Sequence, residues 1–139
     1  MSTTTAIEHI APAPFHVRRT RVLGVAGATL AAVAVWVVAV PVLGTYLVVR
    51  FGNSAPQSVG FGFVVGGSLV ASLLGWGLLV MLERFTSNAR MIWTGLAIGV
   101  LAVSFSLPVG AGTTESTKVA LALMHVAAAG VLIPALRRR

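Results

Sequence analysis

His125 is the side chain in this sequence best placed to do chemistry, because it is an ionisable group inside a long apolar run. Ionisable residues within membrane spans are uncommon and often mark proton or ligand pathways. Counted from Lys118, His125 lies about 10 Å into its run at the rise per residue of a helix. Serines of two other apolar runs fall at a similar depth. The sequence therefore predicts an intramembrane polar cluster of His125, Ser68, Ser104 and Ser106.

Two interpretations of this cluster stay open. In the functional one, His125 belongs to a proton or ligand site that opens outward. In the structural one, its N–H binds a serine hydroxyl or a helix carbonyl and ties helices together, for about 0.6–2 kcal/mol. No carboxylate lies in the apolar runs. That favours the structural interpretation, because proton-coupled transporters commonly use an intramembrane acid.

The sequence lacks the residues that most other chemistries need. The chain has no cysteine, which excludes disulfides and thiolate sites. Ligands for a metal are not clustered, and Met124 points to a different side of a helix from His125, so a haem would lack its second axial ligand. No Ser-His-acid set, HExxH motif or phosphate-binding glycine loop occurs. We therefore expect a non-enzymatic protein with no catalytic residues, no cofactor and no metal.

The one concentrated polar segment is ERFTSNAR, from Glu83 to Arg90. It is short enough to be a tight turn between antiparallel helices. Glu83 is predicted to pair with Arg84, with Arg90 or with the basic ends of other helices. Exposed ion pairs contribute only about 0–1 kcal/mol. These three residues are therefore candidate interfacial charges, and solvated charges are the simpler interpretation.

The composition predicts a membrane protein. Hydrophobic residues make up 57% of the 139 residues and charged residues only 9%, whereas a soluble domain has about 25% charged residues. The net charge of +7 does not indicate nucleic acid, because the basic residues flank apolar runs. The expected partner of most of this surface is the lipid bilayer.

Four apolar runs predict an all-α polytopic fold, an antiparallel bundle of four transmembrane helices in one domain of residues 22–139. Residues 1–21 are predicted to be a disordered cytoplasmic tail with a basic flank, and the first run is long enough to be a retained helix rather than a signal peptide. Pro41 with Gly44 should end the first span, and Pro108 the third. The predicted spans are residues 22–43, 59–82, 91–108 and 118–136.

Small residues four apart recur in these spans, and such spacing lets helix backbones approach closely in lipid. The second span is the richest, which predicts that it is the central packing helix. These faces also suit a homo-oligomer or a membrane-protein partner. The patterns are Gly62 with Gly66, Ala71 with Gly75, and Gly95 with Gly99.

The connections are predicted from turn-forming and capping residues. Residues 45–60 should form an external loop with one short interfacial segment, for which a strand and a helical turn both stay open. Glu115 and Lys118 are spaced to pair at the start of the last span. Thr113, Thr114 and Ser116 are candidates to cap that span. Trp93 is expected at interfacial depth.

Basic residues predict the orientation. With four spans, eight Lys and Arg residues lie on the side of the termini and two, Arg50 and Lys118, lie on the other. Cytoplasmic flanks carry the excess of positive charge. We therefore expect a multi-pass protein of the cell membrane with both termini in the cytoplasm.

Several segments resemble a family of small four-span proteins of actinobacteria that is filed as a domain of unknown function. They are Gly75–Leu79 (GWGLL), Leu82–Thr86 (LERFT), Leu121–His125 (LALMH) and Val131–Pro134 (VLIP), which precedes a basic end. The resemblance covers about residues 22–139. It implies an integral membrane protein of this topology and assigns no catalytic residues.

Together these patterns favour a non-enzymatic accessory or interaction subunit of the plasma membrane, packing through its Gly, Ala and Ser faces. The alternative is a small transporter or permeation component with His125 in the pathway. Replacing His125 by leucine distinguishes them, because a transporter would lose a proton-linked flux and a structural tie would lose only stability.

Overall fold

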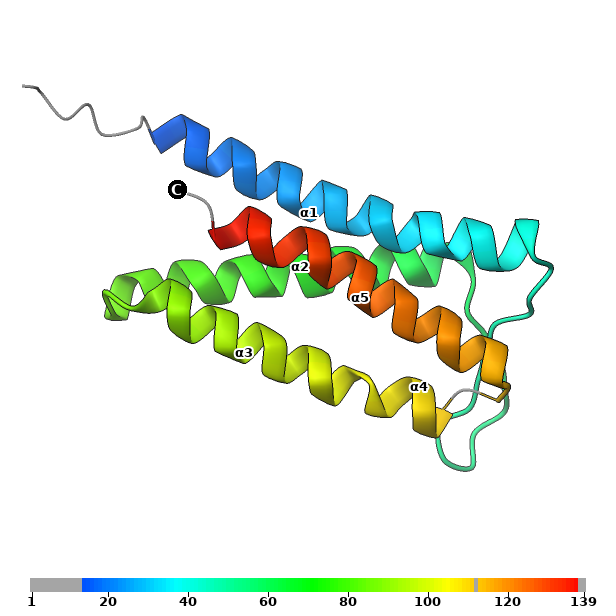
Figure 1. Ribbon diagram of the computed structural model, residues 1–139. Coiled ribbons are helices and arrows are strands. Elements are labelled where there is room, and N and C mark those ends of the chain that lie inside the picture. Colours follow the sequence, from blue (N-terminus) through cyan, green and yellow to red (C-terminus); the bar gives the residue numbers. More distant parts are fainter. Residues whose placement is uncertain (1–13, 112, 138–139) are drawn as a thin grey trace, which may run out of the picture.

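The architecture is set by four long helices that run up and down in turn (Figure 1). The computed structural model describes residues 14–111 and 113–137. α1 and α3 each pack against both α2 and α5. The chain is mostly helical, as the sequence predicts. The helices are α1 (Pro14–Val37), α2 (Phe61–Phe85), α3 (Ala89–Ser104), α4 (Ser106–Ala111) and α5 (Glu115–Arg137).

Three helical segments are long and apolar enough to cross a bilayer. They are Val17–Val42, Phe61–Phe85 and Glu115–Arg137, with 26, 25 and 23 residues. About 20 helical residues cover a hydrocarbon core. α3 has only 16 residues, which is about 24 Å of helix. α4 continues roughly along its direction after a break (Figure 1).

α1 begins at Pro14, earlier than the predicted start of the first span. Proline fits the first turn of a helix, because its φ is already helical and its missing N–H is not needed there. Residues 14–21, predicted as disordered tail, are therefore helical. The rest of the predicted tail, residues 1–13, lies outside the described residues.

The other end of the first span agrees with the prediction. α1 passes into a five-residue π-helix, η1 (Val38–Val42), which contains Pro41. Pro41 lacks an N–H, and the Leu43 N–H bonds the Val38 carbonyl at 3.0 Å. Gly44 then turns the chain at φ +66°, a left-handed conformation that glycine adopts without steric cost.

The prediction that Pro108 ends the third span was wrong. α3 ends at Ser104, and Pro108 is the third residue of the separate helix α4. A proline costs no hydrogen bond in the first turn of a helix. The break instead falls at Phe105, whose N–H is shared between the carbonyls of Leu101 and Ala102 at 3.3 Å each.

The segment 45–60 contains a small antiparallel hairpin, β1 (Val48–Val49) with β2 (Gln57–Ser58). The sequence left a strand and a helical turn open here. The Arg50 N–H bonds the Ala111 carbonyl at 2.8 Å, and the Thr113 hydroxyl donates to the Val48 carbonyl at 2.9 Å. The hairpin is thereby fixed to the α4–α5 connection, at the end of the bundle where α5 begins (Figure 1).

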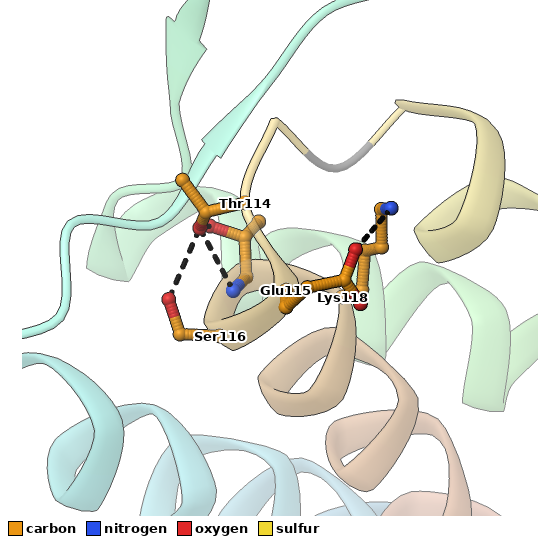
Figure 2. Close-up of polar contacts among 5 residues, drawn as sticks. Thr114, Glu115, Ser116 and Lys118 are labelled. Atoms are coloured by element: carbon orange, nitrogen blue, oxygen red, sulfur yellow. Dashed lines mark hydrogen bonds and ion pairs between the residues drawn. The ribbon is translucent and has the colours of Figure 1, made fainter.

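Thr114, which was one of the three predicted candidates, caps the start of α5 (Figure 2). Its Oγ1 accepts a hydrogen bond from the Thr117 N–H at 3.2 Å and also contacts the hydroxyls of Ser116 and Thr117. Glu115 and Lys118 form the predicted i,i+3 pair, with 2.7 Å between Oε1 and Nζ. Thr117 is fully buried and donates to the Tyr46 carbonyl at 3.3 Å, which joins the start of α5 to the hairpin side of the fold.

Close helix packing occurs between α1 and α5, not around α2 as predicted. A Cβ added at Gly24 would lie 2.6 Å from the Ala135 Cβ, and one at Gly27 would lie 3.1 Å from Val131 Cγ1. Apart from the backbone of its own helix, a Cβ at Gly62 or Gly66 of α2 would meet no atom of the described chain within 4 Å. The tightest glycine contacts within the described bundle are therefore those of α1, although a Cβ at Gly75 of α2 would also meet a neighbouring helix, at 3.7 Å from Leu132 Cδ2.

Candidate functional site

The predicted polar cluster around His125 is not joined by hydrogen bonds. His125 Nδ1 lies 2.7 Å from the Leu121 carbonyl of its own helix. Ser68, Ser104 and Ser106 likewise donate to carbonyls three or four residues earlier, at 2.6–2.7 Å. Such bonds satisfy a polar group within one helix and need no partner helix. A role for these residues in transport or in tying helices together stays a prediction.

The charges of three different helices meet at the end of the bundle where α1 begins. Arg21 Nη2 of α1 donates to Glu83 Oε1 of α2 at 2.5 Å, and Arg90 Nη2 of α3 lies 3.9 Å from the same oxygen. The Arg21 side chain is only 9% exposed, against 29% for Glu83 and 34% for Arg90. A charge-assisted bond that is mostly shielded from water is stronger than a surface pair. We call Arg21, Glu83 and Arg90 the charged cluster.

The packing around Trp93 fixes the position of the charged cluster. Trp93 is buried at the start of α3, and its Nε1–H donates to the Gly75 carbonyl of α2 at 2.7 Å. Trp93 fills the space between helices, and its interfacial depth stays a prediction. Together with the buried Leu79 and Leu136 it forms a small core. This core fixes α2 against α3 and α5, and so fixes the ends that carry Glu83 and Arg90.

The α2–α3 turn is tight, as predicted. α2 ends at Phe85 and α3 begins at Ala89. The Thr86 N–H bonds the Leu82 carbonyl at 2.9 Å, and the Thr86 hydroxyl accepts from the Asn88 N–H at 3.2 Å. These bonds satisfy the backbone at the turn and hold the two helix ends close together.

A cavity of about 450 Å³ opens beside the charged cluster. Apolar side chains of α1 and α2 form part of its wall, and the remaining wall is charged or indole. Its lining residues are Val17, Arg18, Arg21, Trp76, Val80, Glu83 and Arg90. A second cavity, of about 480 Å³, lies at the opposite end and is lined by Arg50, Gly52, Gly110, Ala111 and Thr113. The cavity beside the charged cluster combines charge, burial and an apolar wall, so it is the candidate functional site.

The sequence identified part of this site. Glu83 and Arg90 were candidate interfacial charges, and pairing of Glu83 with the basic end of another helix was one of the predicted alternatives. Arg84, the third candidate, is exposed and does not line the cavity. Arg21 and Trp76 were missed as site residues. A signal for Arg21 was present, because it is the basic residue closest to the apolar run of α1. Trp76 stands in the GWGLL segment of the family resemblance, but that resemblance gave it no role.

Comparison with known proteins defines a class without assigning an activity. The helical bundle has three helices compatible with membrane crossing. The family model described as Family of unknown function (DUF6069) matches residues 12–139, and the chain belongs to this family. No curated protein and no solved structure matches the chain.

Proposed function

We propose that this protein is a non-enzymatic integral membrane protein that works by lateral association with other membrane helices, as an accessory or interaction subunit. It crosses the membrane four times, with α3 and α4 together forming the third crossing. Both termini face the cytoplasm. The arrangement in Figure 1 supports this orientation, because the start of α1, the α2–α3 turn and the end of α5 share one end of the bundle, and most of the basic residues belong to these segments.

The observation that carries the proposal is the open glycine faces of α2 and α3. Apart from the backbone of its own helix, a Cβ added at Gly62, Gly66, Gly95 or Gly99 would meet no atom of the described chain within 4 Å. All four glycines are exposed. Helices in lipid associate where small residues let backbones approach closely, because lipid provides little hydrophobic force between them. Within this bundle Gly24 already serves that purpose. The four open glycines are therefore available to another helix.

A transporter with His125 in its pathway is supported less well. The His125 side chain is half-buried and bonds within its own helix. It lines neither of the two cavities described above. Lateral association rests on the open glycine faces of α2 and α3, so we prefer it to transport.

Replacing the α2 glycines tests the association. We expect the double variant Gly62→Ile/Gly66→Ile to lose self-association in liposomes, because two branched side chains keep the backbones apart. Fluorescence energy transfer between two labelled copies of the full chain measures this, as a fall toward the level of random encounters. The unfolding midpoint of the variant in detergent should stay within a few degrees of wild type, because both sites are open.

Gly67→Ile is the matched control. Gly67 is also exposed and open, but it lies about 100° around the helix from Gly66. We expect energy transfer in this variant to equal that of wild type. Equal losses in both variants, or transfer at the random level in wild type, would contradict association of a second copy through this face.

A further inference from the structure

Three buried N–H groups around the cavity at the charged cluster have no partner among the described residues. They are Arg21 Nε, Trp76 Nε1 and Arg90 Nε. Buried donors without a partner are uncommon in folded proteins, because each loses its bond to water without replacing it. All three belong to residues that line the same cavity. The Arg21 side chain is more than nine-tenths buried, so its Nε cannot turn to bulk water.

The cavity also carries excess positive charge. Arg18, Arg21 and Arg90 line it, and Glu83 is the one acid among the lining residues. Glu83 Oε1 bonds Arg21 Nη2 at 2.5 Å and lies 3.9 Å from Arg90 Nη2. The lining therefore holds three guanidinium groups and one carboxylate, and that carboxylate pairs with two of the three. An added anion would balance the remaining charge. It would accept hydrogen bonds from the three donors once their side chains turn toward it, since all three nitrogens are buried in this structure.

We propose that this cavity binds a phosphate group, with Arg21, Arg90 and Trp76 donating to its oxygens. Guanidinium groups suit phosphate because their planar N–H donors can bind two oxygens at once. An indole N–H can only donate a hydrogen bond, so Trp76 also favours a ligand that carries a hydrogen-bond acceptor. The apolar wall of Val17 and Val80 suits contact with the glycerol or upper acyl region of a lipid. The phosphate comes from an anionic lipid headgroup or from a free ion, and both have the same chemistry at the arginines.

Binding to the full chain in an uncharged detergent tests the site. The probes are dioctanoyl phosphatidylglycerol, dioctanoyl phosphatidylcholine and inorganic phosphate, each titrated while the shift of the unfolding midpoint is recorded. We expect the anionic lipid to bind saturably and the zwitterionic lipid to bind at least tenfold more weakly. Saturable binding of inorganic phosphate, with the same affinity as the anionic lipid, would support the site and would identify a free ion as the source of the phosphate. Binding of the anionic lipid alone supports it with a headgroup as its source.

Variants separate the site from general attraction between a basic protein and an anion. Arg90→Gln should raise the Kd of the bound probe about tenfold, since it removes a charge-assisted bond. Trp76→Phe should raise it about threefold to tenfold, because it removes one neutral donor and keeps the ring. Arg84→Gln is the matched control, since Arg84 stands next to Glu83 but does not line the cavity. Its Kd should not change.

Three results would overturn the proposal. One is absence of saturable binding of both anionic probes to the wild-type chain. Another is equal weakening in Arg90→Gln and Arg84→Gln, which would indicate diffuse attraction. The third is equal affinity for the two lipids. Both carry the same phosphodiester, but the cationic choline of phosphatidylcholine should be repelled by the arginines that line the cavity. The Trp76→Phe variant keeps every charge and most of the packing, so the test remains decisive if Arg90→Gln is poorly folded.

Discussion

Replacing Glu83 by glutamine should lower the free energy of unfolding by about 2 kcal/mol. The substitution keeps the shape of the side chain and removes the charge that Arg21 Nη2 binds at 2.5 Å. Removing one member of a buried ion pair strands its partner, which costs about 3–5 kcal/mol when burial is complete. Glu83 is 29% exposed, so solvent screening reduces the loss. Unfolding in mixed micelles, followed by far-ultraviolet circular dichroism, measures the effect.

Glu115→Gln provides the control for this prediction. Glu115 also pairs with a basic residue, Lys118, at 2.7 Å, but its side chain is 86% exposed. An exposed i,i+3 pair contributes about 0.5 kcal/mol or less. Losses of similar size in the two variants would show that burial does not strengthen the Arg21–Glu83 pair, and would remove the basis for the charged cluster.

A second large effect is expected where α1 meets α5. Gly24→Ala places a Cβ 2.6 Å from the Ala135 Cβ, a separation that requires one helix to move. Overpacking of this kind costs about 1–3 kcal/mol. The unfolding midpoint in the same micelles should therefore fall by several degrees.

Gly67→Ala is the matched substitution in α2. Apart from the backbone of its own helix, a Cβ there would meet no atom of the described chain within 4 Å. Alanine is also favoured over glycine in a helix by about 1 kcal/mol. The free energy of unfolding of this variant should be unchanged or higher. If Gly67→Ala were as destabilising as Gly24→Ala, close approach at Gly24 would not be what joins α1 to α5.

The helices were largely predictable from the sequence, because long apolar runs and the residues that end them are local signals. Pro41 and Gly44 end the first span as expected, and Thr114 caps α5. The errors came from prolines whose effect depends on position. Pro14 begins α1 and Pro108 lies in the first turn of α4, where a proline starts a helix as readily as it ends one.

Which glycines pack, and which charges meet, could not be deduced from spacing. Gly62 and Gly66 have the motif, but Gly24 and Gly27 make the close contacts, because helix order and rotation decide which faces meet. The same holds for Arg21 and Glu83, which are 62 residues apart in the sequence. Their pairing depends on the helix alignment, which no local pattern specifies. His125 was conspicuous in the sequence but bonds only the preceding turn of its helix.

Four membrane crossings require the C-terminus to lie on the same side of the membrane as the N-terminus. Three segments are long enough to cross alone, whereas α3 has 16 residues and needs α4 to complete a crossing. A reporter enzyme that is active only outside the cytoplasm can be inserted after Asn53, in the β1–β2 turn, or fused after Arg139. With four crossings and a cytoplasmic N-terminus, we expect activity at Asn53 and none at Arg139. Activity at both positions would mean that α3 and α4 do not cross, and would contradict the four-crossing bundle.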